Sequence, residues 1–227
     1  KDMNDPKVYK QWQDGTSIGI FQFESQGMTN FMKELKPDCL EDIIAGVSLY
    51  RPGPMDQIPR YIANKKDPDH AVYTHERLKP ILNVTYGCMV YQEQVMQIVR
   101  DLAGYSLGRA DLVRRAMGKK KLDVMAKERE IFINGQVDEQ GNIIVPGCVR
   151  NGITAEDANK IFDEMAEFAK YAFNKSHAAA YAVLSYQTAY LKTYYPAEFM
   201  AAMLNSFLGN LDKIPAYIDE CKRLNID

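Results

Sequence analysis

The sequence predicts a mainly α-helical protein that carries one or two short β-hairpins or strands. Apolar residues recur every three or four positions along most of the chain, which is the helical period. Prolines, glycines and capping residues divide these stretches into segments of helical length. The stretch 137–147 instead places Gly141-Asn142 between Val137 and the β-branched run Ile143-Ile144-Val145, which favours a surface hairpin. We therefore expect one multi-helix domain over residues 1–227.

The amino-terminal segment predicts a short helix followed by a short strand. Asp5 is suited to cap a helix whose first residue is Pro6, and Gly15 ends that helix. Apolar residues then crowd together over 18–23, and this run favours a brief strand.

Two further helices are expected before the first proline-rich turn. Ser25 caps the first, which stops before Pro37, and Asp38 caps the second. The second helix must end at Arg51-Pro52-Gly53-Pro54, because proline lacks a backbone donor and biases the preceding residue away from helix.

The remaining helices follow from the same periodicity. Their expected ranges are 74–82, 92–102, 107–117, 123–134, a helix capped by Thr154, a long one opened by Ser176, one opened by Pro196, and 211–224. For the long helix we expect an inward face made of Ala180, Val183, Leu184, Tyr190, Leu191 and Tyr194.

Composition excludes several classes of protein. The chain has 227 residues, 46% hydrophobic and 26% charged, which is typical of a soluble globular protein. Its net charge of −2 indicates neither nucleic acid nor membrane as a partner, so any phosphate site depends on local clustering of cations. Four widely spaced cysteines favour reduced thiols in a cytosolic protein. Neither end resembles a natural terminus, so we expect both to lie inside a longer protein.

A basic run is the first candidate site. Five cations lie within eight residues: Arg114, Arg115, Lys119, Lys120 and Lys121. Arginine offers a planar fork of donors and lysine a point charge, a combination that suits phosphate. The lysines also fall at a helix end, where they complement the helix dipole on a solvated surface. From the residues alone, both interpretations stay open.

A second candidate lies where the long helix begins. Asn174, Lys175, Ser176 and His177 place a capping side chain, a cation and a hydroxyl at a helix start, where free backbone N–H groups bind anions. Simple helix capping is the competing interpretation. A catalytic Ser176–His177 pair is disfavoured, because adjacent residues of a helix point in different directions.

Two weaker candidates lie elsewhere. Arg51 sits at the base of the proline-rich turn, and the polar run after Tyr91, Gln92-Glu93-Gln94, either binds a base or sugar edge or simply opens a helix. Paired-metal chemistry needs converging carboxylates. The motif Asp67-Pro68-Asp69 is expected instead to be a solvated loop, and nearby histidines add only weak metal-binding signals.

Taken in order and spacing, a series of short motifs resembles the C family of bacterial replicative DNA polymerases, the alpha subunits of DNA polymerase III. The resemblance covers nearly the whole chain. The motifs are Gly19-Ile20-Phe21-Gln22-Phe23-Glu24-Ser25, Arg51-Pro52-Gly53-Pro54, Thr85-Tyr86-Gly87, Tyr91 to Met96, Ala103 to Gly108, Arg114 to Lys120, Phe173 to His177, Tyr186-Gln187-Thr188 and Tyr195 to Phe199.

The resemblance implies a fingers region, cut from a protein whose catalytic aspartates lie in a palm outside this chain. It implies binding of the incoming deoxynucleoside triphosphate and of template-primer DNA. Mg²⁺ would be held by palm residues, so we expect no catalytic residue and no bound cofactor here, and no polymerisation by the chain alone. In the full-length protein it implies other replicase subunits as partners and a cytoplasmic place at the replication fork, with no membrane.

The resemblance also assigns expected site residues. Those expected to bind nucleotide or phosphate are Arg114, Arg115, Lys119, Lys120, Asn174, Lys175, Ser176 and His177. Those expected to support the pocket or contact template are Arg51, Tyr91, Gln92, Glu93, Tyr171 and Phe173.

Two departures from the family pattern stand out: Ala172 replaces a usual glycine, and the hairpin at 137–147 looks like an insertion into a shorter loop.

Three other functions compete with this assignment. The balanced net charge disfavours a non-enzymatic helical nucleic-acid-binding module, and helix geometry disfavours a hydrolase. A role as a scaffold stays open.

Overall fold

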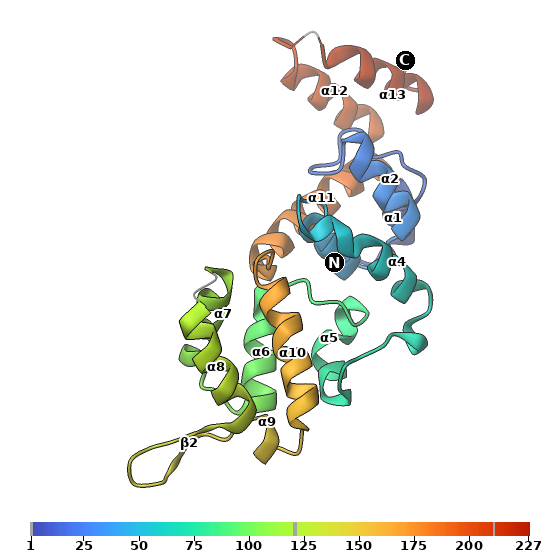
Figure 1. Cartoon of the computed structure of the whole chain (residues 1–227). Coiled ribbons are helices and arrows are strands. Elements are labelled where there is room, and N and C mark those ends of the chain that lie inside the picture. Colours follow the sequence, from blue (N-terminus) through green and yellow to red (C-terminus); the bar gives the residue numbers. More distant parts are fainter. Residues whose placement is uncertain (1, 120–121, 211) are drawn as a thin grey trace. The chain divides into compact units, whose positions relative to one another are not determined.

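A computed structural model of the chain describes residues 2–119, 122–210 and 212–227 (Figure 1). Its described residues form thirteen α-helices and one small antiparallel sheet, which confirms the mainly α fold. They divide into two compact units. The discontinuous unit comprises residues 1–50 and 176–227, and the central unit comprises residues 51–175. That both belong to a single domain stays a prediction.

The discontinuous unit is helical throughout. Its helices are α1 (Pro6–Gln13), α2 (Gln26–Leu35), α3 (Leu40–Leu49), α11 (Lys175–Tyr194, whose first residue belongs to the central unit), α12 (Pro196–Ser206) and α13 (Ile214–Arg223). The predicted caps are confirmed at Asp5 and Ser25, whose side chains accept backbone N–H groups from the first turn. The start of the last predicted helix, Leu211, lies outside the described residues.

The core of the discontinuous unit is aromatic where α1 meets α11. The ring of Tyr9 lies 5.6 Å from that of Tyr186, and the ring of Trp12 lies 5.6 Å from that of Phe23 in an edge-on arrangement. Tyr9, Trp12 and Phe23 are at most 1% exposed. Such pairs add specific geometry to a large apolar burial, so they fix α1 and the loop after it on α11.

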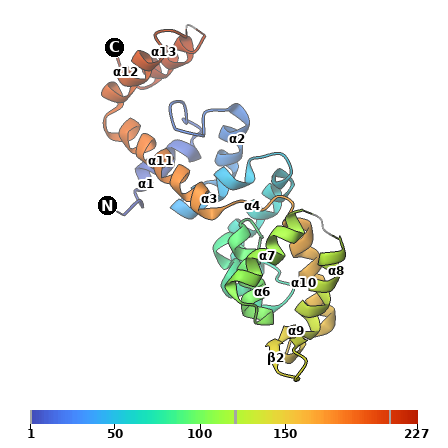
Figure 2. The ribbon, with the colours of Figure 1, turned by 90° about the vertical axis from the view of Figure 1, so that its left-hand side faces the viewer.

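The central unit is a helical bundle with a hairpin (Figures 1 and 2). Its α-helices are α4 (Ile58–Lys66), α5 (Lys79–Leu82), α6 (Gln92–Ala103), α7 (Leu107–Gly118), α8 (Leu122–Asn134), α9 (Gly147–Arg150) and α10 (Ala155–Phe168). Short 3₁₀ helices are η1 (Pro54–Gln57), η2 (Pro68–His70), η3 (Glu76–Leu78) and η4 (Asn83–Thr85). Helices α6, α7, α8 and α10 surround one apolar core, to which Val95, Val99, Phe132 and Phe162 belong.

The predicted hairpin is confirmed and extends away from the helices of the central unit in Figure 1. Strands β1 (Gln136–Val137) and β2 (Ile143–Val145) pair antiparallel, with Gln136 opposite Val145. The turn is held by Asp138, whose carboxylate accepts N–H groups from Gln140 and Asn142. Gly141 has a φ of +83°, a conformation that favours glycine.

The expected strand over 18–23 is wrong. This segment is a series of turns, in which Ile20 N donates to Ser17 O and Phe23 N donates to Ile20 O, both at 3.0 Å. Ile20 and Phe23 lie three residues apart and are both fully buried. The apolar crowding therefore reflects a tightly wound loop, whose backbone groups bond to one another and to side chains of α11 rather than to a strand.

Two predicted helix starts also differ. Helix α3 is capped at Cys39 rather than Asp38, because the carboxylate of Asp42 turns back and accepts the backbone N–H of Asp38. The segment 74–82 is a 3₁₀ turn followed by the short α5, with His75 rather than Thr74 at its start. The hydroxyl of Thr74 instead donates to Glu164 on α10.

The expected inward face of α11 is largely wrong. Leu184, Leu191 and Tyr194 are 41–45% exposed. The buried residues are Ala178, Ala182, Ser185, Tyr186, Ala189 and Lys192. Small side chains let neighbouring backbone approach α11 closely, and hydrogen bonds satisfy the buried polar ones. Choosing the largest apolar side chains therefore predicts the exposed face of α11 instead of its buried face.

None of the helices in the described ranges combines the length and the apolar character needed to cross a membrane.

Candidate functional site

Most of the predicted site residues meet in the central unit. They come from four stretches that are far apart in sequence: the turn that begins at Arg51, the start of α6, the end of α7, and residues 171–175, which lead into α11. Hydrogen bonds and ring contacts link the four stretches into one network, which we call the arginine–glutamate network.

The proline-rich turn holds the segment before α11. A guanidinium N–H of Arg51 donates to Tyr171 O at 2.8 Å, and the guanidinium carbon lies 4.2 Å from the ring centroid of Phe173. Gly53 has a φ of +102°, and a Cβ there would lie 2.4 Å from the Tyr171 ring. Burial lowers the pKa of Arg51. The turn thus needs glycine at 53 and uses Arg51 as a clamp.

A short parallel bridge joins this segment to the start of α6. Tyr91 pairs with Phe173, and Gln92 N donates to Phe173 O at 2.9 Å. Tyr91 is fully buried, and the ammonium of Lys175 lies 5.2 Å from its ring centroid. At this distance the ring attracts the cation, so Tyr91 restricts where Lys175 can reach.

Glu93 occupies the start of α11. Its carboxylate accepts the backbone N–H of Lys175 at 3.0 Å and the side-chain amide of Asn174 at 2.9 Å. A carboxylate at a helix start is favoured by the same free N–H groups that bind a phosphate. The backbone donor of Lys175 and the amide of Asn174 therefore serve a cap made by Glu93, and the Lys175 ammonium remains the group suited to an anion.

Arg114 is anchored on two sides. Its Nε and one terminal nitrogen donate to Asp111 Oδ1, at 3.1 and 2.6 Å, and its other terminal nitrogen donates to Gln92 Oε1 at 3.1 Å. The side chain is 22% exposed. The hydrogen bond from Arg114 lowers the pKa of Asp111. Arg114 thus ties α7 to α6 and is held in one orientation.

Arg115 shares the same carboxylate but faces solvent. Its Nε lies 2.8 Å from Asp111 Oδ2, and its side chain is 63% exposed. Residues three and four positions after an aspartate both lie beside it on a helix, so one carboxylate orients two neighbouring arginines. A shared anchor of this kind leaves Arg115 accessible to a phosphate.

The other predicted residues fall outside this network. Lys119 is exposed at the end of α7, where its N–H donates to Arg115 O at 3.1 Å, and Lys120 lies outside the described residues. Ser176 and His177 are exposed and belong to the discontinuous unit. There the His177 ring lies 4.4 Å from the Tyr181 ring.

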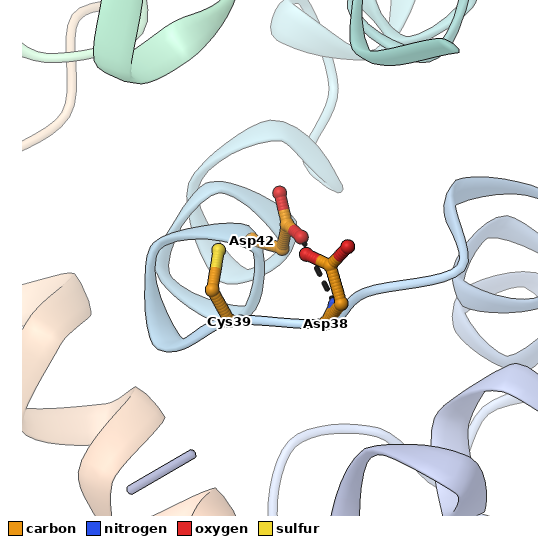
Figure 3. A group of neighbouring side chains, drawn as sticks. All are labelled: Asp38, Cys39 and Asp42. Carbon is orange, nitrogen blue, oxygen red and sulfur yellow. Dashed lines mark hydrogen bonds between the residues drawn. The ribbon is translucent and has the colours of Figure 1, made fainter. Parts of the chain in front are cut away.

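One group of metal-type ligands occurs among the described residues, formed by Asp38, Cys39 and Asp42 (Figure 3). The carboxylate of Asp42, in the first turn of α3, accepts the backbone N–H of Asp38 at 3.2 Å. Burial raises the pKa of Cys39 to about 11, so its thiol is protonated at neutral pH. Asp42 is fully buried, and a protonated thiol does not suit Mg²⁺, which takes oxygen ligands and keeps several waters, so this group fits the structure of the helix start and not a Mg²⁺ site.

The segment Asp67-Pro68-Asp69 is exposed, as expected for a solvated loop. The Asp67 carboxylate lies 2.7 Å from His70 Nδ1, and both side chains are at least 60% exposed. A solvated pair of this kind stabilises a turn and provides no converging carboxylates.

Asp111 is the residue whose part in the site the sequence reasoning missed. It is not among the predicted site residues, yet its carboxylate bonds to both Arg114 and Arg115. The signal that reveals it is the spacing of three and four residues to two successive arginines.

Known proteins match the chain over nearly all of its length. It is 52% identical to the DNA polymerase III subunit alpha of Xylella fastidiosa over 225 residues, which are 99% of the chain and 18% of that protein. It is 49% identical to the same subunit of Pasteurella multocida, covering 99% of the chain and 19% of the relative. The Thermus aquaticus subunit is 49% identical, with 99% and 18% covered.

The chain thus spans about a fifth of the length of the curated relatives that it matches. A family model described as the bacterial DNA polymerase III alpha subunit finger domain matches residues 1–140. Since this model matches more than half of the chain and the relatives are about half identical over nearly all of it, the chain belongs to the family of bacterial DNA polymerase III alpha subunits.

Proposed function

We propose that this chain forms the part of a DNA-directed DNA polymerase that binds the incoming deoxynucleoside triphosphate and the template-primer. The single observation that carries the proposal is the shared carboxylate of Asp111, which holds Arg114 and Arg115 next to each other at the end of α7. Two fixed guanidinium groups suit a triphosphate, because each is a planar fork of donors that stays charged at any working pH.

The two arginines would then divide the work. The guanidinium group of Arg114 donates to Asp111 and Gln92, so the role of Arg114 is to position α7 and to contribute positive charge. Arg115 is the more exposed, and we assign it the direct contact with phosphate oxygens. Lys119 and Lys120 follow in the sequence, and Lys175, at the start of α11, belongs to the same unit and is a further candidate for a phosphate contact.

The remaining residues support this arrangement. Arg51 and Gly53 fix Tyr171 and Phe173 before α11, so these rings are suited to pack near the nucleotide or the template. Glu93 and Asn174 fix the start of α11, from which Ser176 and His177 follow. Preorganised donors of this kind stabilise developing charge without having to reorganise during the reaction.

In the full-length protein, the primer 3′-hydroxyl would attack the α-phosphate and pyrophosphate would leave. Mg²⁺ would stabilise the attacking and leaving oxygens. The one group of three metal-type ligands among the described residues, Asp38, Cys39 and Asp42, does not fit Mg²⁺, and we propose that its ligands lie in a palm outside this chain. The role of the residues described above is to bind and orient the triphosphate. We further propose that the full-length protein works with other replicase subunits at the replication fork, in the cytoplasm.

The test is steady-state primer extension by the full-length enzyme. We expect Arg115→Ala to raise KM for the nucleotide, with a loss of about 1.5–3 kcal/mol in kcat/KM for one charge-assisted hydrogen bond. Arg100→Ala is the matched control, since Arg100 is a half-exposed arginine on α6 that pairs only with its neighbour Asp101 within the described ranges. An unchanged kcat/KM in Arg115→Ala would remove this residue from the site.

A second measurement concerns the chain by itself. We expect no templated primer extension from the purified 227-residue chain, because the carboxylates for the metal ions would lie elsewhere. Titration with labelled primer-template at several salt concentrations separates this proposal from that of an independent nucleic-acid-binding module. Tight binding with steep salt dependence, unaffected by nucleotide, would favour the independent module.

A further inference from the structure

A cavity of about 410 Å³ opens on the discontinuous unit, lined by the amino-terminal segment and one face of α11. Its described lining residues are Asp2, Met3, Asp5, Tyr186, Tyr190 and Tyr194. The tyrosines are spaced four residues apart, which stacks them along a single helix face. None of these described lining residues is basic.

Hydrogen bonds hold the two walls of the cavity together. The Tyr194 hydroxyl donates to Asp5 Oδ2 at 2.5 Å, and Asp5 N donates to the Tyr186 hydroxyl oxygen at 3.1 Å. The hydroxyl of the buried Tyr9 donates to Met3 O at 2.5 Å. The segment that carries the carboxylates is therefore fixed on α11 before any ligand arrives.

The charge of the lining selects the class of ligand. The hydrogen bond from Tyr194 lowers the pKa of Asp5, and the same bond raises the pKa of Tyr194 to about 12. At neutral pH the lining thus pairs ionised Asp5 with a protonated hydroxyl, and Asp2 adds a second carboxylate. These charges repel anions, and a neutral apolar ligand would strip water from them without replacing it.

The aromatic rings add a second attraction for cations. The rings of Tyr190 and Tyr194 lie 4.8 Å apart between centroids, with their planes at 41°. A tyrosine face attracts an ammonium or a guanidinium group. A divalent metal ion instead prefers six or more oxygen ligands, and this lining offers two carboxylates.

We propose that this cavity binds an alkylammonium or alkylguanidinium head, the group carried by a lysine or arginine side chain of a polypeptide and also by a free polyamine. The head would lie between the carboxylates and the tyrosine rings, and the alkyl stem would lie against Met3 and the ring edges.

The test is NMR titration of the 227-residue chain with ¹³C-labelled tyrosine rings. The probes are N-acetyl-lysine methylamide, N-acetyl-arginine methylamide and spermidine. N-acetyl-norleucine methylamide is the neutral control, because it keeps the four-carbon stem of the lysine probe and lacks the ammonium group. We expect at least one cationic probe to shift the resonances of Tyr190 and Tyr194, and to bind about tenfold more tightly than the norleucine probe. Tighter binding of a capped amino acid identifies a basic side chain as the source, and tighter binding of spermidine identifies a free polyamine.

Two variants locate the effect. Tyr190→Leu removes a ring and keeps an apolar side chain, and we expect roughly fivefold weaker binding. Asp2→Asn keeps the shape and removes a charge, and we expect about threefold weaker binding. Tyr195→Leu is the matched control, because Tyr195 is 52% exposed and does not line the cavity.

The proposal is overturned if the norleucine probe binds as tightly as the cationic probes. It is overturned equally if Asp2→Asn and Tyr190→Leu leave the affinity for the cationic probes unchanged. Circular dichroism reports whether each variant folds, and if Tyr190→Leu does not fold, Asp2→Asn alone decides.

Discussion

Lys192 carries an ammonium group into the interior of the discontinuous unit, where its side chain is 0% exposed. Its Nζ donates to Thr16 O and Ile18 O, at 2.7 Å each, and lies 2.6 Å from Glu220 Oε1. Three partners satisfy the three ammonium protons. The bonds join α11 to α13 and to the loop after α1. We therefore predict that Lys192→Met, which keeps most of the stem, destabilises this unit.

The magnitude follows from what the substitution leaves behind. An acceptor that stays buried without a donor costs about 1–3 kcal/mol, and breaking a buried ion pair from one side costs about 3–5 kcal/mol. These losses overlap, and Arg223 keeps two hydrogen bonds to Glu220, at 2.6 and 2.8 Å. We expect the free energy of unfolding to fall by about 3 kcal/mol.

Urea unfolding followed by tryptophan fluorescence measures this loss. Trp12 is the single tryptophan of the sequence, and it is fully buried in the same unit. Lys222→Met is the matched control, because the Lys222 side chain is 73% exposed and its pairing with Asp219 is worth less than about 1 kcal/mol. If Lys192→Met unfolds within about 1 kcal/mol of the wild type, the buried ammonium is not stabilising and the reasoning fails.

Three further predictions concern the arginine–glutamate network. Gly53→Ala should lower the free energy of unfolding of the central unit by on the order of 2 kcal/mol, because it adds a strained backbone and a contact with Tyr171; hydrogen exchange measures this, with Gly152→Ala as a control that has the strain but open space. Glu93→Ala should cost about 1 kcal/mol by removing the cap of α11, and an unchanged melting temperature would contradict that role. Asp111 has a pKa held below its ordinary value of 3.8, so its pairing stabilises the fold above that value and is lost as pH falls through the lowered pKa; acid unfolding of Asp111→Asn should lack this step.

Local signals in the sequence determined much of the secondary structure. Asp5, Ser25 and Thr154 cap helices as predicted, because a cap is a contact within one turn of the chain. The hairpin followed from Gly141, whose φ is positive in the turn. Such features depend on residues a few positions apart, so a linear reading finds them.

The predictions that were wrong concern segments whose structure depends on contacts with distant parts of the chain. The loop at 18–23 resembles a strand in composition, yet Lys192 and Ser185 of α11 bond its backbone and hold it in turns. The exposed Leu184 and Leu191 of α11 show that side-chain size alone does not select the buried face.

By itself, the sequence determined the mainly helical fold, the family, and which cations are candidates for phosphate. Only the tertiary structure decided how those candidates are held. It places Glu93 on the start of α11, and it ties Arg114 to Gln92 and Asp111 while Arg115 stays accessible. The physical reason is that a charged side chain is defined by its partners, and residues 81 positions apart, such as Glu93 and Asn174, become partners only once the chain has folded.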